Sequence, residues 1–216
     1  MTSFNELKLF TSFKTISTAE FYNCSNLVAI DCRNVTARAT GDPHTFSGCS
    51  KLVKLVLRNF SGYFGYNGSI NTNRSILKNC SSLKRLIMPS CVNLDLLSEG
   101  AGTPVFTMMD FGQNLSVLCR YTGTSYSSAL GINNSTVIVI RSTTPATGNA
   151  TQIGRIRKLF VPASALQEWR ESSSFSPAAS YIFAIGGEEW VSLYGSSSED
   201  ANLTQEEYDD NYGSLN

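Results

Sequence analysis

Six cysteines and one histidine are the residues of this 216-residue chain best suited to metal binding or covalent catalysis. No two cysteines are separated by only two residues, so the usual zinc and thioredoxin-type spacings are missing. His44 stands in a Gly-Asp-Pro-His-Thr stretch that is typical of a turn, and no nucleophile motif accompanies it. We therefore predict a protein that is not an enzyme, with no catalytic residues, no metal site and no cofactor.

Charged residues give no better site. The carboxylate pair Asp209–Asp210 invites comparison with calcium or glycosidase sites, but EF-hand spacing is absent and a tail offers no walls around a substrate. The basic residues are dispersed and accompany no nucleic-acid-binding motif, so we expect no nucleic-acid partner. The members considered for a basic stripe are Lys84, Arg85, Arg155, Arg157 and Lys158.

Aromatic residues supply the best binding candidates. Tyr63, Phe64 and Tyr66 lie in a glycine-rich insertion, and Tyr121 and Tyr126 lie in a stretch rich in Ser and Thr. Such rings stack on sugars or fill a pocket of a protein partner. The alternative is that they only cover the side of the fold, and the sequence leaves both interpretations open.

The elements that would position these residues come from a repeat. An aromatic or aliphatic residue, a cysteine and two aliphatic residues recur at steps of three: Phe21, Cys24, Leu27, Ile30; Phe46, Cys49, Leu52, Leu55; and Leu77, Cys80, Leu83, Leu86. We interpret Met109, Gly112, Leu115 and Leu118 as a fourth, degenerate copy. At a repeated interior position cysteine acts as a small apolar residue, so we expect free, buried thiols.

Each copy ends in a stretch typical of a strand. The predicted strands are 27–30, 52–57, 83–88, 136–140 and 156–162, and Pro89 ends the third. The period then becomes helical, with Ser164 and Gln167 as a capping box, and Ser176-Pro177 starts a second short helix or a turn. One repeat cannot bury its apolar residues alone, so the copies should stack into a solenoid with parallel strands on one face.

Charge divides the chain. Residues 1–185 hold all 17 Lys and Arg and nine of the 17 Asp and Glu, whereas residues 186–216 hold eight acids and no base. We predict a solenoid over 1–190 and an acidic tail over 191–216. The tail either keeps the protein dispersed or docks on a basic surface of its own body or of a neighbouring subunit. No run of about 18 apolar residues exists, so we expect no membrane insertion, and the N-terminus has no signal-peptide pattern.

The stretches Phe21–Ile30 and Phe46–Leu55 resemble BspA-type leucine-rich repeats, and Phe160–Trp169 with Phe175 and Tyr181–Ile182 resembles the segment that closes such arrays. The likeness covers roughly residues 4–190. It implies a β-rich leucine-rich-repeat solenoid of the α/β class, with short parallel strands stacked on one face and a helical C-terminal cap. Only three copies keep the cysteine, and the array is short.

The resemblance also implies a function. Similar arrays occur in bacterial surface adhesins of Bacteroides-like bacteria and in structural proteins of their phages. We expect a phage virion structural or attachment protein, such as a fibre, decoration or tail-associated protein. It would bind other virion proteins or a host-surface protein or glycan, with homo-oligomerisation left open. The alternative is a BspA-like adhesin at the bacterial cell surface or secreted.

Overall fold

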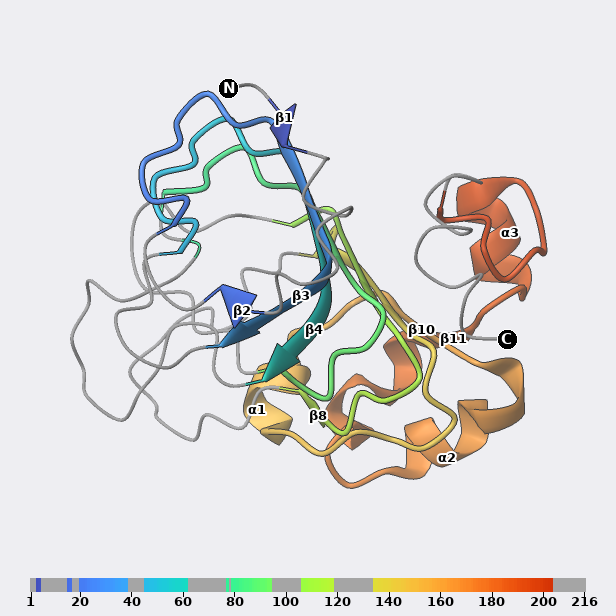
Figure 1. Ribbon diagram of the computed structural model, residues 1–216. Helices are drawn as coiled ribbons and strands as arrows, with labels where there is room; N and C mark the ends of the chain where they lie inside the picture. Colours follow the sequence, from blue (N-terminus) through green and yellow to red (C-terminus); the bar gives the residue numbers. More distant parts are fainter. Residues whose placement is uncertain are drawn as a thin grey trace.

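A computed structural model of the chain shows a curved layer of strands with helices gathered toward its C-terminal end (Figure 1). The described residues are 3–4, 15–16, 20–38, 45–61, 77, 79–94, 106–118 and 134–203, with the backbone alone described at 3–4, 15–16, 33–38 and 58–61. The chain is of the α/β class, since a parallel sheet is its main element and its helices are few and short.

One parallel sheet organises the described residues, and it is not closed into a barrel. Its spatial order is β1 (Ser3–Phe4), β3 (Ala29–Arg38), β4 (Lys54–Ser61), β5 (Arg85–Met88), β7 (Met108–Phe111), β9 (Val137–Ile140), β10 (Leu159–Val161) and β11 (Ile182–Ala184), with β2 (Thr15–Ile16) also paired to β3. A second, two-stranded sheet joins β6 (Asn93–Leu94) to β8 (Val117–Leu118). All five strands predicted from the sequence are present. Their bounds differ from the predicted ones by four residues or fewer, except that β3 continues eight residues beyond its predicted end.

The register places one buried residue of each strand directly beside the next. This inward row is Ile30, Leu55, Leu86, Met109, Ile138, Leu159 and Ile182. Every member is 1% exposed or less. Full burial of one such side chain stabilises a fold by about 1.5–3 kcal/mol, so the row is a major source of the fold's stability.

The turns that precede the first three long strands repeat the same geometry, and Figure 1 shows them nested at the upper left. Asn23, Gly48 and Asn79 each precede a repeat cysteine and each has a positive φ, of 58°, 82° and 61°. Asn and Gly are the residues that adopt this left-handed conformation most readily. The repeat is therefore a property of the backbone as well as of the apolar side chains.

The cysteines of the repeat link neighbouring turns. The Cys49 thiol donates to the Phe21 carbonyl at 3.0 Å, and the Cys80 thiol donates to the Phe46 carbonyl at 3.0 Å. The Phe21 and Phe46 rings stack with centroids 5.4 Å apart. The prediction of free thiols is confirmed for five cysteines: Cys24, which is half-buried, and Cys32, Cys49, Cys80 and Cys91, which are buried. Cys119 lies outside the described residues.

The predicted alignment of the fourth copy is wrong. Met109 pairs with Leu86, the last position of the third copy, and not with its first position, Leu77. Because the apolar spacing is three at every step, a shift along the repeat preserves the pattern, and spacing alone does not set the register. The residue that follows Leu83 in the stack is the buried Phe106, three residues before Met109.

Short helices close the C-terminal end of the core. They are α1 (Ala150–Ile153), the 3-10 helix η2 (Ala163–Ala165), α2 (Leu166–Glu171), the 3-10 helix η3 (Ser176–Tyr181) and α3 (Glu188–Tyr194). Trp169 of α2 is fully buried against Phe175, with ring centroids 4.8 Å apart, and its indole N–H donates to the Ser142 carbonyl. No described helix is long and apolar enough to cross a membrane.

The two helix starts predicted from the sequence have different outcomes. The predicted start at Ser176-Pro177 is confirmed, because η3 begins there. The predicted capping box is wrong: no side chain caps η2 or α2, and the Gln167 amide donates to Glu171 within the helix. A 3-10 turn precedes α2, so Ser164 lies inside that turn and not at the boundary of a helix.

Candidate functional site

The aromatic residues predicted to bind a partner lie outside the described part of the structure. This holds for Tyr63, Phe64, Tyr66, Tyr121 and Tyr126, as it does for His44 and the pair Asp209–Asp210. Among the described residues, no group of three or more His, Cys, Asp or Glu side chains is arranged to hold a metal ion. The candidate site is therefore built from the outward face of the sheet, where a charged group is buried.

The outward face is apolar over most of its described width. Side chains alternate between faces along a strand, so the residue after each inward position points outward. This outward row is Asp31, Val56, Ile87, Asp110, Val139, Phe160 and Phe183. Two clusters form on it, separate from the main core: one contains Val56, Ile87 and Met108, and the other contains Val139, Phe160, Ile185 and Trp190.

Asp110 lies between the two clusters and is 0% exposed. Its carboxylate accepts two hydrogen bonds from Arg141, from Nε at 3.1 Å and from Nη2 at 3.0 Å. Arg141 directly follows β9, the strand beside β7, so the parallel register brings the two side chains together. A paired, bidentate geometry of this kind is what a carboxylate needs in order to stay ionised away from water.

The remaining contacts of this ion pair come from the end of the chain. Glu188–Leu203, hereafter the C-terminal segment, begins with α3 and returns across the outward face. Arg141 Nη1 donates to the Glu199 carbonyl and to Asp200 Oδ1, both at 3.1 Å, and its Nη2 also donates to Asn202 Oδ1 at 3.1 Å. With the two bonds to Asp110, all five N–H groups of the guanidinium are used.

Asn202 completes the network. Its side-chain amide donates to the Asp110 carboxylate, and its backbone carbonyl accepts from Arg85 Nη2 at 3.3 Å. Asn202 is 8% exposed and lies 92 positions from Asp110 along the chain. The sheet therefore forms hydrogen bonds with both the side chain and the backbone carbonyl of this residue.

Apolar contacts flank the polar network on both sides. Trp190 packs edge-on against Phe160, with ring centroids 5.1 Å apart, and against Tyr194 at 4.6 Å. Its indole N–H donates to the Ser198 carbonyl at 2.8 Å, which ties α3 to the chain that follows. Leu203 packs on the other cluster, the one formed by Val56, Ile87 and Met108. The sheet is consequently covered on both faces.

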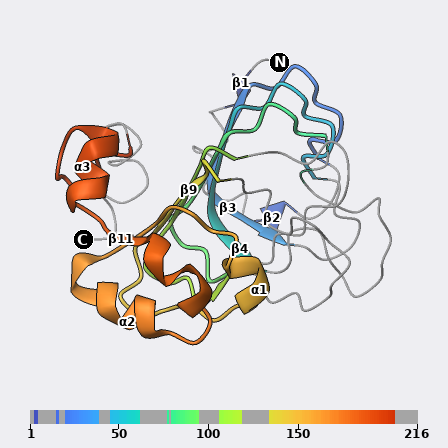
Figure 2. The same cartoon turned by 180° about the vertical axis from the view of Figure 1, so that it is seen from behind.

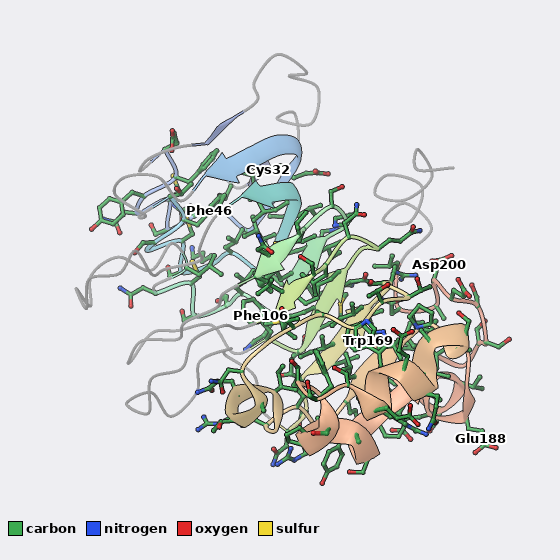
Figure 3. The ribbon with its side chains drawn as sticks, turned by 90° about the horizontal axis from the view of Figure 1, so that it is seen from below. Cys32, Phe46, Phe106, Trp169, Glu188 and Asp200 are labelled. Atoms are coloured by element: carbon green, nitrogen blue, oxygen red, sulfur yellow. The ribbon has the colours of Figure 1, made fainter. Side chains whose placement is uncertain are left out.

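In the figures the C-terminal segment is seen on the side of the sheet away from the repeat turns. Both opposite views place α3 there (Figure 1, Figure 2). In the view from below, Asp200 lies nearer the strands than Glu188 does (Figure 3). Lys158 makes a further ion pair with Glu189, at 3.3 Å. The predicted division between residues 190 and 191 falls inside α3, and through Leu203 the acidic segment is docked on the body of its own chain.

Two titratable groups of the segment are perturbed by this environment. Burial raises the pKa of the Asp200 carboxyl above its ordinary value; Arg141 opposes the rise, and Glu199 and Asp110 add to it. Burial raises the pKa of the Tyr194 phenol to about 12, with Asp110 adding to the rise and Arg85 opposing it. A phenol is protonated at neutral pH even at its ordinary pKa, so this rise leaves its charge unchanged there, and the ring packs against Trp190.

Several of the basic residues considered as a stripe in the sequence are engaged within the molecule. Arg157 donates to the carbonyls of Gly154 and Ile156, and its guanidinium lies 4.7 Å from the centroid of the Tyr181 ring. Lys158 and Arg85 contact the C-terminal segment, as described above. These contacts hold the fold and the segment together.

The arrangement holds a turn of polypeptide, since the stretch that contacts Arg141, Glu199–Asn202, is in a turn conformation. It offers an apolar surface at each end. Between them lie an arginine that donates hydrogen bonds and a carboxylate that accepts them, both in fixed directions. Sequence reasoning missed Asp110, Arg141 and Asn202. One signal was available: Asp110 interrupts the otherwise apolar strand Met108–Phe111. A charged residue inside such a strand is rarely buried without a partner.

Comparison with known proteins adds no relative. No family model matches this sequence, and a search of curated proteins finds no match.

Proposed function

We propose that this chain is a non-enzymatic leucine-rich-repeat solenoid that holds its own C-terminal segment on the outward face of its sheet and serves as a structural or attachment component of a phage virion. The observation that carries the proposal is the C-terminal segment itself. The outward face holds it through a buried ion pair, through hydrogen bonds to the side chain and the backbone of Asn202, and through two apolar clusters.

The solenoid part of the proposal is supported by the register of the strands. Residues at matching repeat positions lie side by side from β3 to β5, and the cysteine at one position donates to the turn of the preceding copy. Each copy therefore buries its apolar residues against its neighbours, which is the defining energetic feature of repeat proteins.

The virion part is supported by the resemblance of the repeats to BspA-type arrays in phage structural proteins. In this proposal the chain is located in the particle, where it contacts other virion proteins or a host-surface protein or glycan. The same resemblance includes bacterial adhesins, which would place it at the cell surface or among secreted proteins. The two locations predict different biochemical fractions.

The test is mass spectrometry of purified particles and of cell-envelope fractions from the source culture. We expect peptides of this chain in density-purified particles, in a constant ratio to the major structural proteins and resistant to salt washing. Recovery only from the envelope, on a longer chain that carries an export signal, would overturn the virion assignment in favour of an adhesin. A saturable hydrolytic activity that a point substitution abolishes would overturn the non-enzymatic assignment.

A further inference from the structure

The C-terminal segment is joined to the rest of the described fold through two glycines. β11 ends at Ala184, and the chain passes through Gly186 and Gly187 before α3 begins at Glu188. Gly186 has a φ of 76°, and a Cβ there would lie 2.8 Å from the Ser197 carbonyl oxygen. The chain therefore folds back through a tight turn that requires glycine, and this turn sets the path of everything after it.

The hydrogen bonds of the segment to the sheet lie beyond this turn and reach strands distant in sequence, whereas α3 also packs on β11 and Ile185, directly before the turn. Asn202 bonds to Asp110 and Arg85, and Asp200 bonds to Arg141, across separations of 92, 117 and 59 residues. None of these contacts requires that the segment and the sheet belong to the same chain. A second copy would present the same strands, in the same register, to the same segment.

Charge favours such an encounter between copies. The residues before Gly186 carry an excess of eight positive charges and those from Gly186 onward carry eight negative charges, so a free segment is attracted to the body of any copy. The described exposed hydrophobic residues are spread over several elements: Tyr22, Val28, Val53, Val92, Tyr181, Val191 and Leu193. Exchange of the segment would join subunits without a further apolar surface.

We propose that the C-terminal segment, Glu188–Leu203, is exchanged between two copies of this chain, with Gly186–Gly187 as the hinge. In the exchanged dimer the segment of one copy lies on the outward face of the other, and Arg141 of each copy binds Asp200 and Asn202 of its neighbour. Every contact described for the single chain is kept, and only the turn at the hinge opens. This inference goes beyond the proposed function, and because its test uses purified protein it can fail while the virion assignment stands.

The ion pair between Lys158 and Glu189 provides the readout, because its 3.3 Å separation suits a zero-length carbodiimide cross-link. Full-length protein with natural isotopes and fully ¹⁵N-labelled protein are unfolded, mixed in equal amounts, refolded together and separated by size. The cross-linked Lys158–Glu189 peptides of each fraction are then analysed by mass spectrometry. In the dimer fraction we expect about half of these cross-links to join a light peptide to a heavy one, and almost none in the monomer fraction.

A hinge-shortened chain, with Gly186 and Gly187 deleted, provides a second test, because the deletion should force the exchange of the segment. Without the turn the segment cannot fold back on its own sheet, so we expect the mass measured by light scattering to double and the mixed-label cross-link to persist. A chain with six Gly and Ser residues inserted at the hinge is the matched control and should return to the monomer. Glu189→Gln removes the cross-link in both backgrounds and identifies its origin.

Two results would overturn the proposal. One is a dimer, formed by the natural chain or by the hinge-shortened chain, in which the Lys158–Glu189 cross-links join only peptides of the same label. In such a dimer each segment would have stayed on its own copy. The other is the absence of any dimer and any mixed-label cross-link after joint refolding of the natural chain at the highest soluble concentration. That second result decides the question even if the hinge-shortened chain does not fold.

Discussion

Replacing Asp110 with alanine tests whether the buried ion pair holds the C-terminal segment on the sheet. The substitution removes the acceptor of three hydrogen bonds, two from Arg141 and one from Asn202. It leaves the Arg141 side chain, which is only 11% exposed, with a charge that Asp110 no longer balances. We expect the segment to detach partly and the free energy of unfolding to fall.

The loss of stability depends on which hydrogen-bond acceptors Arg141 retains. Hydrogen bonds to charged groups contribute about 1.5–3 kcal/mol each. If the three lost bonds simply added, the free energy of unfolding would fall by well over about 4 kcal/mol, which is an upper limit. Arg141 retains Asp200, the Glu199 carbonyl and Asn202 Oδ1, which reduces the cost of its lost partner. Removing one member of a buried pair usually costs about 3–5 kcal/mol, and we expect a value near 4 kcal/mol.

Urea unfolding followed by circular dichroism measures this change. For a domain of about 200 residues, 4 kcal/mol corresponds to a fall in Tm of roughly 8–16 °C. Asp31→Ala is the matched control, because Asp31 occupies the same outward row in β3 but is half-buried and outside the two clusters. We expect that control to cost less than about 1 kcal/mol.

Asp110→Asn separates the charge from the shape of the side chain. Its amide group would direct hydrogens at the N–H donors of Arg141 and Asn202, so we expect it to restore little of the lost stability. If the asparagine variant were as stable as the natural chain, the ion pair would not be what stabilises this face. If Asp110→Ala cost no more than Asp31→Ala, the reasoning from burial would also be refuted.

Three further predictions use other parts of the structure. Trp190→Ala should lower the free energy of unfolding in urea by about 3–5 kcal/mol, because the ring is fully buried, whereas Leu193→Ala on the exposed side of α3 should change it little. Gly112→Ala should lower the free energy of unfolding in urea by about 3 kcal/mol or more, because its Cβ would lie 1.5 Å from the Pro89 carbonyl oxygen. Gly195→Ala, where nothing lies within 4 Å, should cost only the roughly 1–2 kcal/mol of its left-handed backbone. Burial raises the pKa of the Cys80 thiol to about 12, so the folded chain keeps a proton that the unfolded chain releases above the ordinary thiol pKa. Cys80 should therefore contribute a fall in stability of about 1.4 kcal/mol per pH unit between roughly pH 9 and 11, in addition to the falls from Cys49 and Cys91, whose pKa values burial also raises. Urea unfolding across that range should show a shallower fall for Cys80→Ala.

Much of the fold could be predicted because the information is local. A strand shows itself in consecutive apolar residues, and a proline such as Pro89 ends it within a few positions. The burial of Cys49 and Cys80 follows from their recurrence at one position of the repeat. Each of these inferences needs only a short window of sequence, and the structure agrees with each of them.

The register of the degenerate copy could not be predicted in this way. Met109 satisfies the three-residue spacing equally well at the first position of a copy and at the last. The signal that would have separated the two is the positive-φ residue before the cysteine, which is Asn23, Gly48 and Asn79 in the three clear copies. In the predicted alignment Gly112 takes the place of the cysteine, so the equivalent position is Phe111, which lies in β7 and has no positive φ. The residue type of the turn was therefore absent where the alignment required it.

The candidate site could not be predicted because its parts are far apart in the chain and different in kind. Asp110, Arg141 and Asn202 come from two strand regions and a segment with no periodic pattern. Only the parallel register brings the first two together, and only the turn at Gly186 brings the third. Composition described the last thirty residues correctly as acidic, but net charge cannot distinguish a solvated segment from one whose few apolar residues fit a face.

That distinction rests on how the outward face is built. A parallel sheet with Val56, Ile87, Val139 and Phe160 in one outward row would expose a continuous apolar surface if nothing covered it, and such surfaces are prone to association. Two apolar clusters alone would bind many different apolar segments, and each segment could bind at several positions along the face. The buried Asp110, placed between them, penalises any partner that does not bring a hydrogen-bond donor to that point. We therefore interpret the ion pair as the determinant of register: apolar contacts supply most of the attraction, and the charge decides which segment fits and where it stops.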